Sequence, residues 1–492
     1  MIIYLRKVNL SYLIRFFSGP VAALLIIFFV DIDAANPMTT RMVAVTVWMA
    51  LWWLTEVVHL AVTSLLPFLL IPVPGIADTT TIANEYMDPI MFLFIGGFIL
   101  AIAIEHWNLH KRIALRILMA VGKSPASILA GVMGTTYFFS MWISNTATVL
   151  MMIAAVTAVI HQIEKQAGHH TNKIATGLMI GLAYSATIGG MATLVGTPPN
   201  MVFYRFYEKA FPQNHDMDFT QWFLIGFPIS IAFLVISYFV LKWMFIPKAS
   251  KAFEEWDTSY FKEEYKKLGA FSYEEKWVAG IFSFTALLWF TRSDIDFGSF
   301  NMPGWKNIFP NPANIQDGTV AIAMAMLLFF IPSKTKKEEM LIGWEQAKKL
   351  PFHILLLFGS GFALAKGFEL SGLSTWLAGN LNFMKDANPF VLVLTICILV
   401  TVISEFASNV ASIQLTLPIL LALVGTMGVH PLLLMLPATF AASLGFMLPV
   451  ATGPNTIVFG SGRIKVADMM RAGLILDIIG ILIITLGIMV WK

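Results

Sequence analysis

Two short polar motifs interrupt the most apolar parts of this chain. In WISNTATVLMM, Ser144, Asn145 and Thr146 follow one another, and in FASNVASIQLTLP, Ser408 precedes Asn409. Hydroxyl and carboxamide groups both donate and accept hydrogen bonds, and leaving them unpaired in an apolar environment is costly. The pairs therefore predict either a polar ligand site or small polar residues that hold helices together.

Each polar pair is followed by a motif that breaks a helix, VGTPPN at 195–200 and VATGPN at 450–455. Proline removes a backbone donor, and glycine permits turns that other residues avoid. Such a break is tolerated at membrane depth only where it is buried in protein or lines a wet cavity. Free N–H groups at helix N-termini suit anions, and carbonyl groups at turns and C-termini suit Na⁺. The motifs thus predict a small-anion site with sodium ions beside it.

The motifs belong to an internal repeat. LFIGGFILAIAIEHWNL (93–109) aligns with LFGSGFALAKGFELSGL (357–373) at an offset of 264, and the same offset carries the first Ser-Asn pair onto the second. The two break motifs are related by an offset of 255. Because both polar pairs recur in the same order before a helix break, ligand binding is favoured over simple helix packing.

The composition is that of a polytopic helical membrane protein. Of the 492 residues, 58% are hydrophobic and 12% are charged, whereas about a quarter of residues are charged in soluble domains. Many apolar stretches approach the ~20 residues that cross a bilayer. We predict an all-α fold of about eleven transmembrane helices plus two re-entrant hairpins. The single cysteine, Cys397, excludes an intrachain disulfide.

The basic residues predict the orientation of the chain. With the N-terminus in the cytoplasm, 23 of the 32 Lys and Arg residues fall in segments placed inside, and the C-terminus lies outside. The basic amphipathic segment 108–122 should lie along the inner membrane surface, and 247–276 should form a cytoplasmic loop. The two halves then have opposite orientations, a plan that recurs in secondary transporters with a binding site at mid-membrane.

At these residues the chain resembles the divalent anion–sodium symporter family, which includes sodium-coupled dicarboxylate, citrate and sulfate transporters. The resemblance covers most of the chain. Its most specific motifs are ALWWLTEVVHLAVTSLLP (50–67), FFSMWISNTATVLM (138–151), VGTPPN (195–200), GFALAKGFELSGLS (361–374), SNVA (408–411) and FMLPVATGPN (446–455).

The resemblance implies a homodimeric elevator transporter with a scaffold and a transport domain. The implied divisions are 1–125 (scaffold helices 1–4 and an interfacial helix), 126–246 (first hairpin, broken helix 5 and helix 6, transport domain), 247–385 (cytoplasmic loop and scaffold helices 7–9) and 386–492 (second hairpin, broken helix 10 and helix 11, transport domain).

The same resemblance implies the residues that bind the cargo. Those implied for the substrate are Ser144, Asn145, Thr146, Thr197, Ser408, Asn409 and Thr452. Those implied for two sodium ions are Ser140, Ser144, Asn145 and Gly196 in one set and Ser404, Ala407, Asn409 and Ala451 in the other. Val410 and Gly453 depart from the family pattern, where a threonine and a proline are common.

Ionisable residues in or beside the spans are further candidates. Glu405 precedes the second Ser-Asn pair by three residues and could tune it. Lys366 and Glu369 lie three residues apart, so they are expected to pair on one helix face. For these residues structural pairing is favoured over direct ligand contact.

The sequence favours sodium-coupled symport of small divalent anions, most of all C4-dicarboxylates such as succinate, across a bacterial inner membrane or a plasma membrane. A membrane-embedded enzyme is disfavoured because the chain has no H-E-x-x-H or G-x-S-x-G motif. The expected partners are a dicarboxylate, Na⁺, membrane lipids and a second copy of the chain, with no nucleic acid. Sodium-independent exchange of dicarboxylate or citrate, sulfate transport and proton coupling through Glu405 stay open.

Overall fold

A computed structural model describes most of the chain. The described residues are 10–120, 124–167, 172–213, 217–246, 259–296, 301–336, 338–380 and 387–491. The basic residues Arg6 and Lys7, and the part of the predicted cytoplasmic loop up to residue 258, lie outside them.

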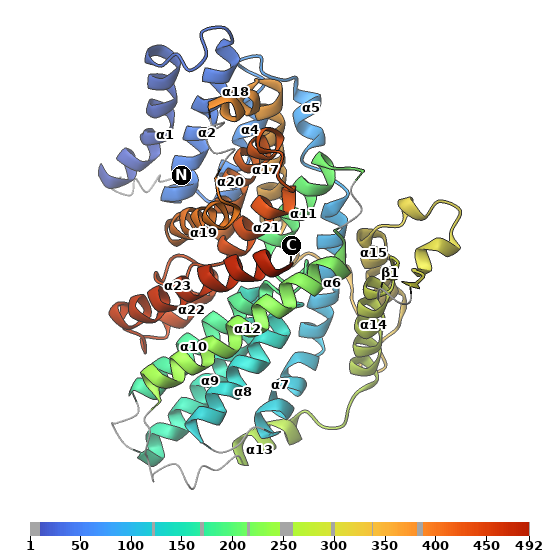
Figure 1. Ribbon diagram of the computed structural model, residues 1–492. Helices are drawn as coiled ribbons and strands as arrows, with labels where there is room; N and C mark the ends of the chain where they lie inside the picture. The colour runs from blue at the N-terminus through green and yellow to red at the C-terminus, as the bar shows by residue number, and fades with distance from the viewer. Residues whose placement is uncertain are drawn as a thin grey trace, which may run out of the picture.

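The described chain is almost entirely helical, which confirms the all-α class (Figure 1). The first half contains α1 Leu10–Phe29, α2 Pro37–Thr55, α3 Leu60–Thr63, α4 Leu66–Leu70, α5 Thr79–Asn84, α6 Ile90–His106, α7 Leu109–Ala120, α8 Pro125–Ser140, α9 Asn145–Ala167, α10 Asn172–Gly190, α11 Pro198–Ala210 and α12 Phe219–Phe245. The second half contains α13 Ser259–Lys267, α14 Tyr273–Phe290, α15 Asp317–Phe330, α16 Trp344–Ala347, α17 Phe352–Leu370, α18 Leu373–Asn380, α19 Pro389–Phe406, α20 Asn409–Met427, α21 Pro431–Ala441, α22 Gly453–Gly460 and α23 Val466–Trp491.

A small irregular segment joins α14 to α15. It contains two-residue antiparallel strands, β1 Ile295–Asp296 and β2 Asn301–Met302, and the 3₁₀ turns Trp305–Ile308 and Pro312–Asn314. These strands, with an isolated antiparallel bridge between Pro332 and Met340, are the β structure of the described chain. They are too short to change the fold class.

Six described helices are long and apolar enough to cross a membrane, or seven if the bent pair α6 and α7 counts as one span. The structure thus confirms a multi-span membrane protein, and the prediction of about eleven spans stays a prediction. The described chain also contains shorter apolar helices, such as Asp317–Phe330 and Pro431–Ala441. The axis of α7 is bent by 66° from that of α6, as expected for a helix that leaves the membrane core to lie along its surface.

The two halves of the chain repeat one order of helices. The segment of α6, the pair α8–α9, the broken pair α10–α11 and the long α12 corresponds to α17, α19–α20, α21–α22 and α23. The halves are interlocked, because α11 packs on α20 and α22 packs on α9. Each broken helix therefore continues against the hairpin of the other half, which brings the four polar motifs to one region.

Helix α10 forms the centre of the first half, and every residue of Ile174–Gly190 is buried. It is unusually rich in small residues, and Gly189 shows why. A Cβ at Gly189 would overlap the backbone carbonyl of Tyr137, so only glycine lets α10 approach α8 this closely. This contact sets the first hairpin against the broken helix.

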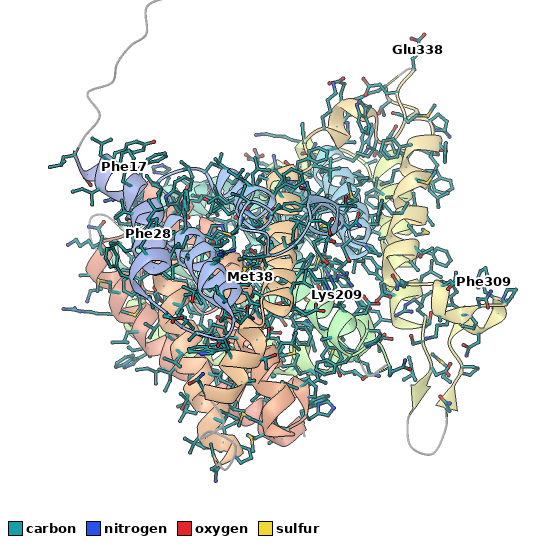
Figure 2. All side chains as sticks on the ribbon, turned by 90° about the horizontal axis from the view of Figure 1, so that it is seen from above. Phe17, Phe28, Met38, Lys209, Phe309 and Glu338 are labelled. Carbon is teal, nitrogen blue, oxygen red and sulfur yellow. The ribbon has the colours of Figure 1, made fainter. Side chains whose placement is uncertain are left out.

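The two lateral edges of the molecule are different in character. Helix α1 packs on α2, where the Trp52 indole donates to the Phe16 carbonyl at 3.0 Å. Phe17 and Phe28 project from α1 away from the body of the molecule (Figure 2). The opposite edge is formed by α14, α15 and the β1–β2 segment that carries Phe309 (Figures 1 and 2). The apolar exterior of α1 is suited to lipid.

Ion pairs fix the end of α11 to the turn between α5 and α6. Arg205 pairs with Asp88 and Lys209 pairs with Glu85. The Arg205 guanidinium also lies 5.8 Å from the ring centre of Phe362 on α17. These contacts join the first broken helix to the helices around it.

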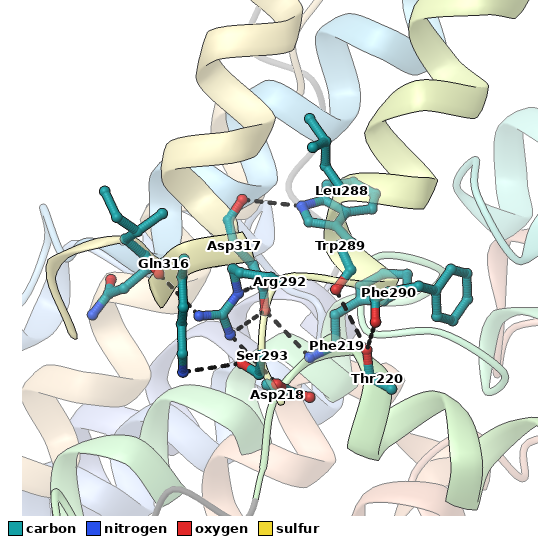
Figure 3. A network of polar contacts seen from close by, with 12 residues as sticks. Asp218, Phe219, Thr220, Leu288, Trp289, Phe290, Arg292, Ser293, Gln316 and Asp317 are labelled. Carbon is teal, nitrogen blue, oxygen red and sulfur yellow. Dashed lines mark hydrogen bonds and ion pairs between the residues drawn. The ribbon is translucent and has the colours of Figure 1, made fainter. Parts of the chain in front are cut away.

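A buried charged network fixes the start of α12 to α14 and α15 (Figure 3). The Arg292 guanidinium donates to one Asp317 oxygen at 2.5 Å, and the other Asp317 oxygen accepts from the Phe219 amide at 3.2 Å. A carboxylate oxygen of Asp218 lies 3.6 Å from Arg292. Because Asp317 is only 1% exposed, its charge depends on this single guanidinium.

Replacing Arg292 with leucine should therefore destabilise the protein by about 3–5 kcal/mol, since it leaves the Asp317 carboxylate buried without a cation. The thermal unfolding midpoint of the purified protein in detergent measures this. As a control, Lys348→Gln removes an exposed pair with Glu345 and should cost less than about 1 kcal/mol. Equal midpoints for the two variants would contradict the prediction.

Candidate ligand site at the helix breaks

The two Ser-Asn motifs lie at the tips of two helical hairpins. The first tip joins α8, which ends at Ser140, to α9, which begins at Asn145. The second joins α19 to α20, which begins at Asn409. Both serines cap the helix that follows, because Ser144 Oγ accepts from Ala147 N at 3.3 Å, and Ser408 Oγ accepts from the Ala411 amide at the same distance. The tips are only partly buried, so their polar groups are accessible to a ligand.

The Asn145 carboxamide lies in a cluster of oxygen atoms. One of its polar atoms is 2.8 Å from Ser140 Oγ, 3.2 Å from the Ala186 carbonyl and 3.3 Å from the Gly196 carbonyl. With the amide nitrogen in that position, the group donates to these oxygens. With the carboxamide oxygen there, the cluster becomes a set of four oxygen ligands, which suits a hard cation. The structure thus brings three of the four residues predicted for the first sodium together and adds Ala186.

The second half repeats the contact between serine and asparagine. Ser404 Oγ lies 3.1 Å from Asn409 Oδ1 and 2.6 Å from the Ala442 carbonyl oxygen, so its one O–H has two acceptors within reach, 264 residues after the Ser140–Asn145 pair. Beside them, Gly445 lies close enough for a Cβ to contact Ala451 and the Ser404 carbonyl, at 3.3 and 3.4 Å. Ala407 ends α19 next to the tip. The described contacts thus join Ser404 to Asn409 and place Gly445 beside both Ser404 and Ala451, and the sodium site at these residues stays a prediction.

Two asparagines that the prediction did not include brace the helix breaks. The Asn200 amide donates to the carbonyls of Gly190 and Thr193 at 2.9 and 2.7 Å. In the other half, the Asn455 amide donates to the carbonyls of Gly445 and Leu448 at 2.9 and 3.0 Å.

Each asparagine and its two carbonyl partners in the first half correspond, at the offset of 255, to an asparagine and two carbonyl partners in the second half. The repeat therefore extends to individual hydrogen bonds. The signal was present in the sequence, because each asparagine is the last residue of its break motif. What the sequence lacked was the identity of the carbonyls that the asparagines hold.

The breaks also place Thr197 and Thr452 at the starts of α11 and α22. Both threonines are buried N-cap residues, and Thr452 Oγ1 accepts a hydrogen bond from the backbone N–H of Asn455 at 3.2 Å. The halves meet where a Cβ at Gly453 would overlap the Thr146 hydroxyl. Gly453, noted above as a departure from proline, therefore leaves room for the first hairpin tip.

Four helices begin at these motifs, namely α9, α11, α20 and α22. A helix N-terminus carries a partial positive charge and usually presents free N–H groups. The first residues of α9, α20 and α22 have an N–H, whereas α11 begins with two prolines and contributes the helix dipole alone. The hairpin tips and the break residues supply hydroxyl and carboxamide groups around them. This combination can bind a small anion through neutral dipoles, with cations held by the oxygen clusters.

The structure assigns Glu405 a bracing contact. Its carboxylate accepts from the backbone amides of Met447 and Leu448 at 2.8 and 3.1 Å, within the second helix break. Lys366 and Glu369 pair at 3.0 Å, as predicted. Both observations agree with the expectation of structural pairing for these ionisable residues.

Comparison with known proteins places the chain among membrane transporters. A family model described as "Sodium:sulfate symporter transmembrane region" matches residues 12–492. The chain is 38% identical over 487 residues to the sodium-dependent dicarboxylate transporter SdcS of Staphylococcus saprophyticus, covering 98% of this chain and 91% of the relative. It is 40% identical over 480 residues to the protein of the same name from Staphylococcus aureus, covering 96% and 90%.

The fold is also similar to a solved structure of Neisseria gonorrhoeae MtrF, which is described as illuminating a class of antimetabolite efflux pumps. The TM-score is 0.58 at 11% sequence identity, and the match covers 90% of this chain and 96% of the other. At this identity the likeness concerns the fold alone.

The packing around Asn145 gives a direct test of the first oxygen cluster. A Cβ at Gly190 would overlap the Asn145 carboxamide, so Gly190→Ala should displace that group. Sodium affinity should fall by about tenfold or more, equivalent to about 1.4 kcal/mol. The measurement is the rise in thermal unfolding midpoint when NaCl replaces KCl.

The matched control is Gly425→Ala in α20, another helical glycine, which has open space at its Cβ position. This variant should keep the wild-type response to sodium. If Gly190→Ala responds as fully as the control, Asn145 is not part of a sodium site.

Proposed function

The chain belongs to the sodium:sulfate symporter family, and on that premise we propose that it is a sodium-dependent dicarboxylate transporter. It is a transporter and not an enzyme. The observation that carries the proposal is the identity of about 40%, over nearly the whole chain, to relatives named for this activity.

The proposed substrate is a C4-dicarboxylate such as succinate. Two carboxylates, one at each end of a short carbon chain, match two copies of a hydroxyl and carboxamide motif that face one region. The proposed contacts are made by Ser144, Asn145, Thr146, Thr197, Ser408, Asn409 and Thr452. The starts of α11 and α22 beside the two threonines add the positive ends of two helix dipoles, which favour negative charge, although Pro198, Pro199 and Pro454 themselves carry no N–H.

Sodium ions are proposed at the two oxygen clusters. One ion is held by Ser140, Ser144, Asn145 and Gly196, and the Ala186 carbonyl is a further oxygen at this position. The other is held by Ser404, Ala407, Asn409 and Ala451. The first residues of α9 and α20, at the two hairpin tips, carry no charge. A cation at each cluster would therefore supply the positive charge that balances a bound dianion. Binding of the two cargoes is then mutually dependent, which couples them.

We further propose that transport follows an elevator mechanism in a homodimer, with eleven spans, two hairpins and the N-terminus in the cytoplasm. The transport domain comprises 126–246 and 386–492, and the scaffold comprises 1–125 and 247–385. In support, the helices that carry the site motifs interlock, since α11 packs on α20 and α22 on α9. Ion pairs join the two proposed bodies, so they would have to break when one body moves; they are Arg205–Asp88, Lys209–Glu85 and Arg292–Asp218.

The alternatives are sodium-independent exchange of dicarboxylate or citrate, and transport of sulfate. Proton coupling through Glu405 is less favoured, because its two oxygens already accept backbone N–H groups at the second break. A carboxylate in that position has a structural task that accounts for its burial.

The first experiment is uptake of labelled succinate by the full-length protein in proteoliposomes. An inward sodium gradient should drive concentrative uptake, and replacing Na⁺ with K⁺ should abolish it. Uptake that ignores sodium but requires internal dicarboxylate would replace symport with exchange. Uptake of sulfate in place of succinate would change the substrate and keep the coupling.

The two carboxamides are expected to act together. Asn145→Ala and Asn409→Ala should each lower sodium-driven uptake by more than about tenfold, because each removes a ligand of both cargoes. The control is Asn380→Ala, which removes an exposed carboxamide at the end of α18 and should transport normally. Normal uptake by either site variant would remove that residue from the proposed site.

A further inference from the structure

A basic cavity outside the proposed ligand site is lined by the starts of α10 and α23, the end of α12 and the turn after α22. Figure 1 shows where these helices lie in the fold. Its volume is about 1240 Å³. The polar part of its lining includes Lys173 from α10, Arg463 and Lys465 from the turn between α22 and α23, and Arg471 from α23. Nothing in the proposed transport cycle uses these four cations.

Most of this positive charge is uncompensated within the described chain. Arg463 pairs with Glu164 and donates to it a second time at 3.3 Å. The described residues place no carboxylate within ion-pair distance of Lys173, Lys465 or Arg471, and Asp468 is the one acidic residue of the lining. The cavity therefore carries a net positive charge and suits an anion.

The other wall of the cavity is apolar and faces outward. Trp243 of α12 is 75% exposed, and Leu474 of α23 is 48% exposed. Beyond Leu474 the exposed apolar residues of α23 recur at helical spacing, at Ile478, Leu482 and Leu486. Because α12 and α23 are both candidate membrane spans that pack on each other, this stripe runs from the cations into the apolar region.

A cluster of cations that continues into an apolar stripe matches a molecule with an anionic head and a hydrocarbon tail. We propose that this cavity binds the headgroup of an anionic phospholipid, with an acyl chain lying along α23 beside Trp243. Guanidinium and ammonium groups bind phosphate through charge-assisted hydrogen bonds, and an exposed tryptophan favours the interface between headgroups and acyl chains.

The location on the chain supports a lipid rather than a soluble anion. The segment 463–471 is one of those assigned to the cytoplasmic side by the distribution of basic residues, and anionic lipids on that side attract basic clusters. Basic pockets between transmembrane helices on this side are suited to phospholipid headgroups. The inference depends on the membrane setting of the chain and not on the identity of the transported substrate.

The test compares phosphatidylglycerol with phosphatidylcholine, which has the same acyl chains and no net charge. The purified full-length protein is mixed with each lipid in detergent, and bound lipid is counted by native mass spectrometry. The variant that removes cations from the cavity, called the groove variant below, combines Lys173→Gln, Lys465→Gln and Arg471→Gln. Its matched control, Lys262→Gln with Lys266→Gln and Lys276→Gln, removes three exposed charges from α13 and α14.

The wild type and the control should both retain phosphatidylglycerol in preference to phosphatidylcholine, and the groove variant should lose that preference. Millimolar inorganic phosphate should not displace the bound lipid. A groove variant that keeps the preference, or a wild type that has none, would overturn the proposal. Displacement by phosphate alone would also overturn it and would indicate a small-anion site.

If the groove variant does not purify as a monodisperse protein, the wild type still decides the matter. Bound phosphatidylglycerol should then protect the cavity lysines, Lys173 and Lys465, from an amine-reactive reagent, while phosphatidylcholine should not. Lys262 is exposed and is not among the residues that line the cavity, so it should react equally in both lipids. Equal labelling of the cavity lysines in the two lipids would count against the proposal.

Discussion

Interrupted helices inside a membrane protein carry a strict requirement, because every freed backbone group must find a partner or a ligand. The chain meets it with a few polar side chains that hold the breaks open. Asn200 and Asn455 each donate to two carbonyl groups, and Glu405 accepts from two amides. Once these groups are satisfied, the remaining N–H and C=O groups at the breaks are available to cargo. The rest of the site depends on this arrangement.

Because the chain contains an internal repeat, the same arrangement of a hairpin tip and a broken helix occurs twice and forms the two sides of the site. Each half supplies a hairpin tip and a broken helix, and the crossed packing of α11 on α20 and of α22 on α9 brings all four together. Thr146 and Gly453 lie against each other at one of the contacts between the halves. A dicarboxylate also has two similar ends, so the symmetry of the site corresponds to the symmetry of its proposed substrate.

Charge is distributed very differently between the site and the edges of the molecule. Permanent ion pairs, such as Arg292 with Asp317 and Arg112 with Glu275, connect helix ends and loops away from the breaks. The hairpin tips instead use neutral dipoles. An anion bound by neutral groups and exchangeable cations can leave again when the cations leave, whereas a buried arginine would hold it more permanently. The proposed lipid-binding cavity differs from the transport site in this respect, because its fixed cations suit a ligand that stays bound.

Much of this could be predicted from the sequence because it is encoded locally or by repetition. Composition determined the membrane class, the offsets of 264 and 255 determined the repeat, and three-residue spacing predicted the Lys366–Glu369 pair. Only the tertiary structure decided which carbonyls Asn200 and Asn455 hold, that Ala186 joins the Asn145 cluster, and that Gly453 makes room for Thr146. The asparagine contacts cross a helix break over 7 or 10 residues, and the other two contacts join residues of different helices. Spacing along the chain predicts which side chains share a helix face, but contacts between helices follow from how whole helices pack.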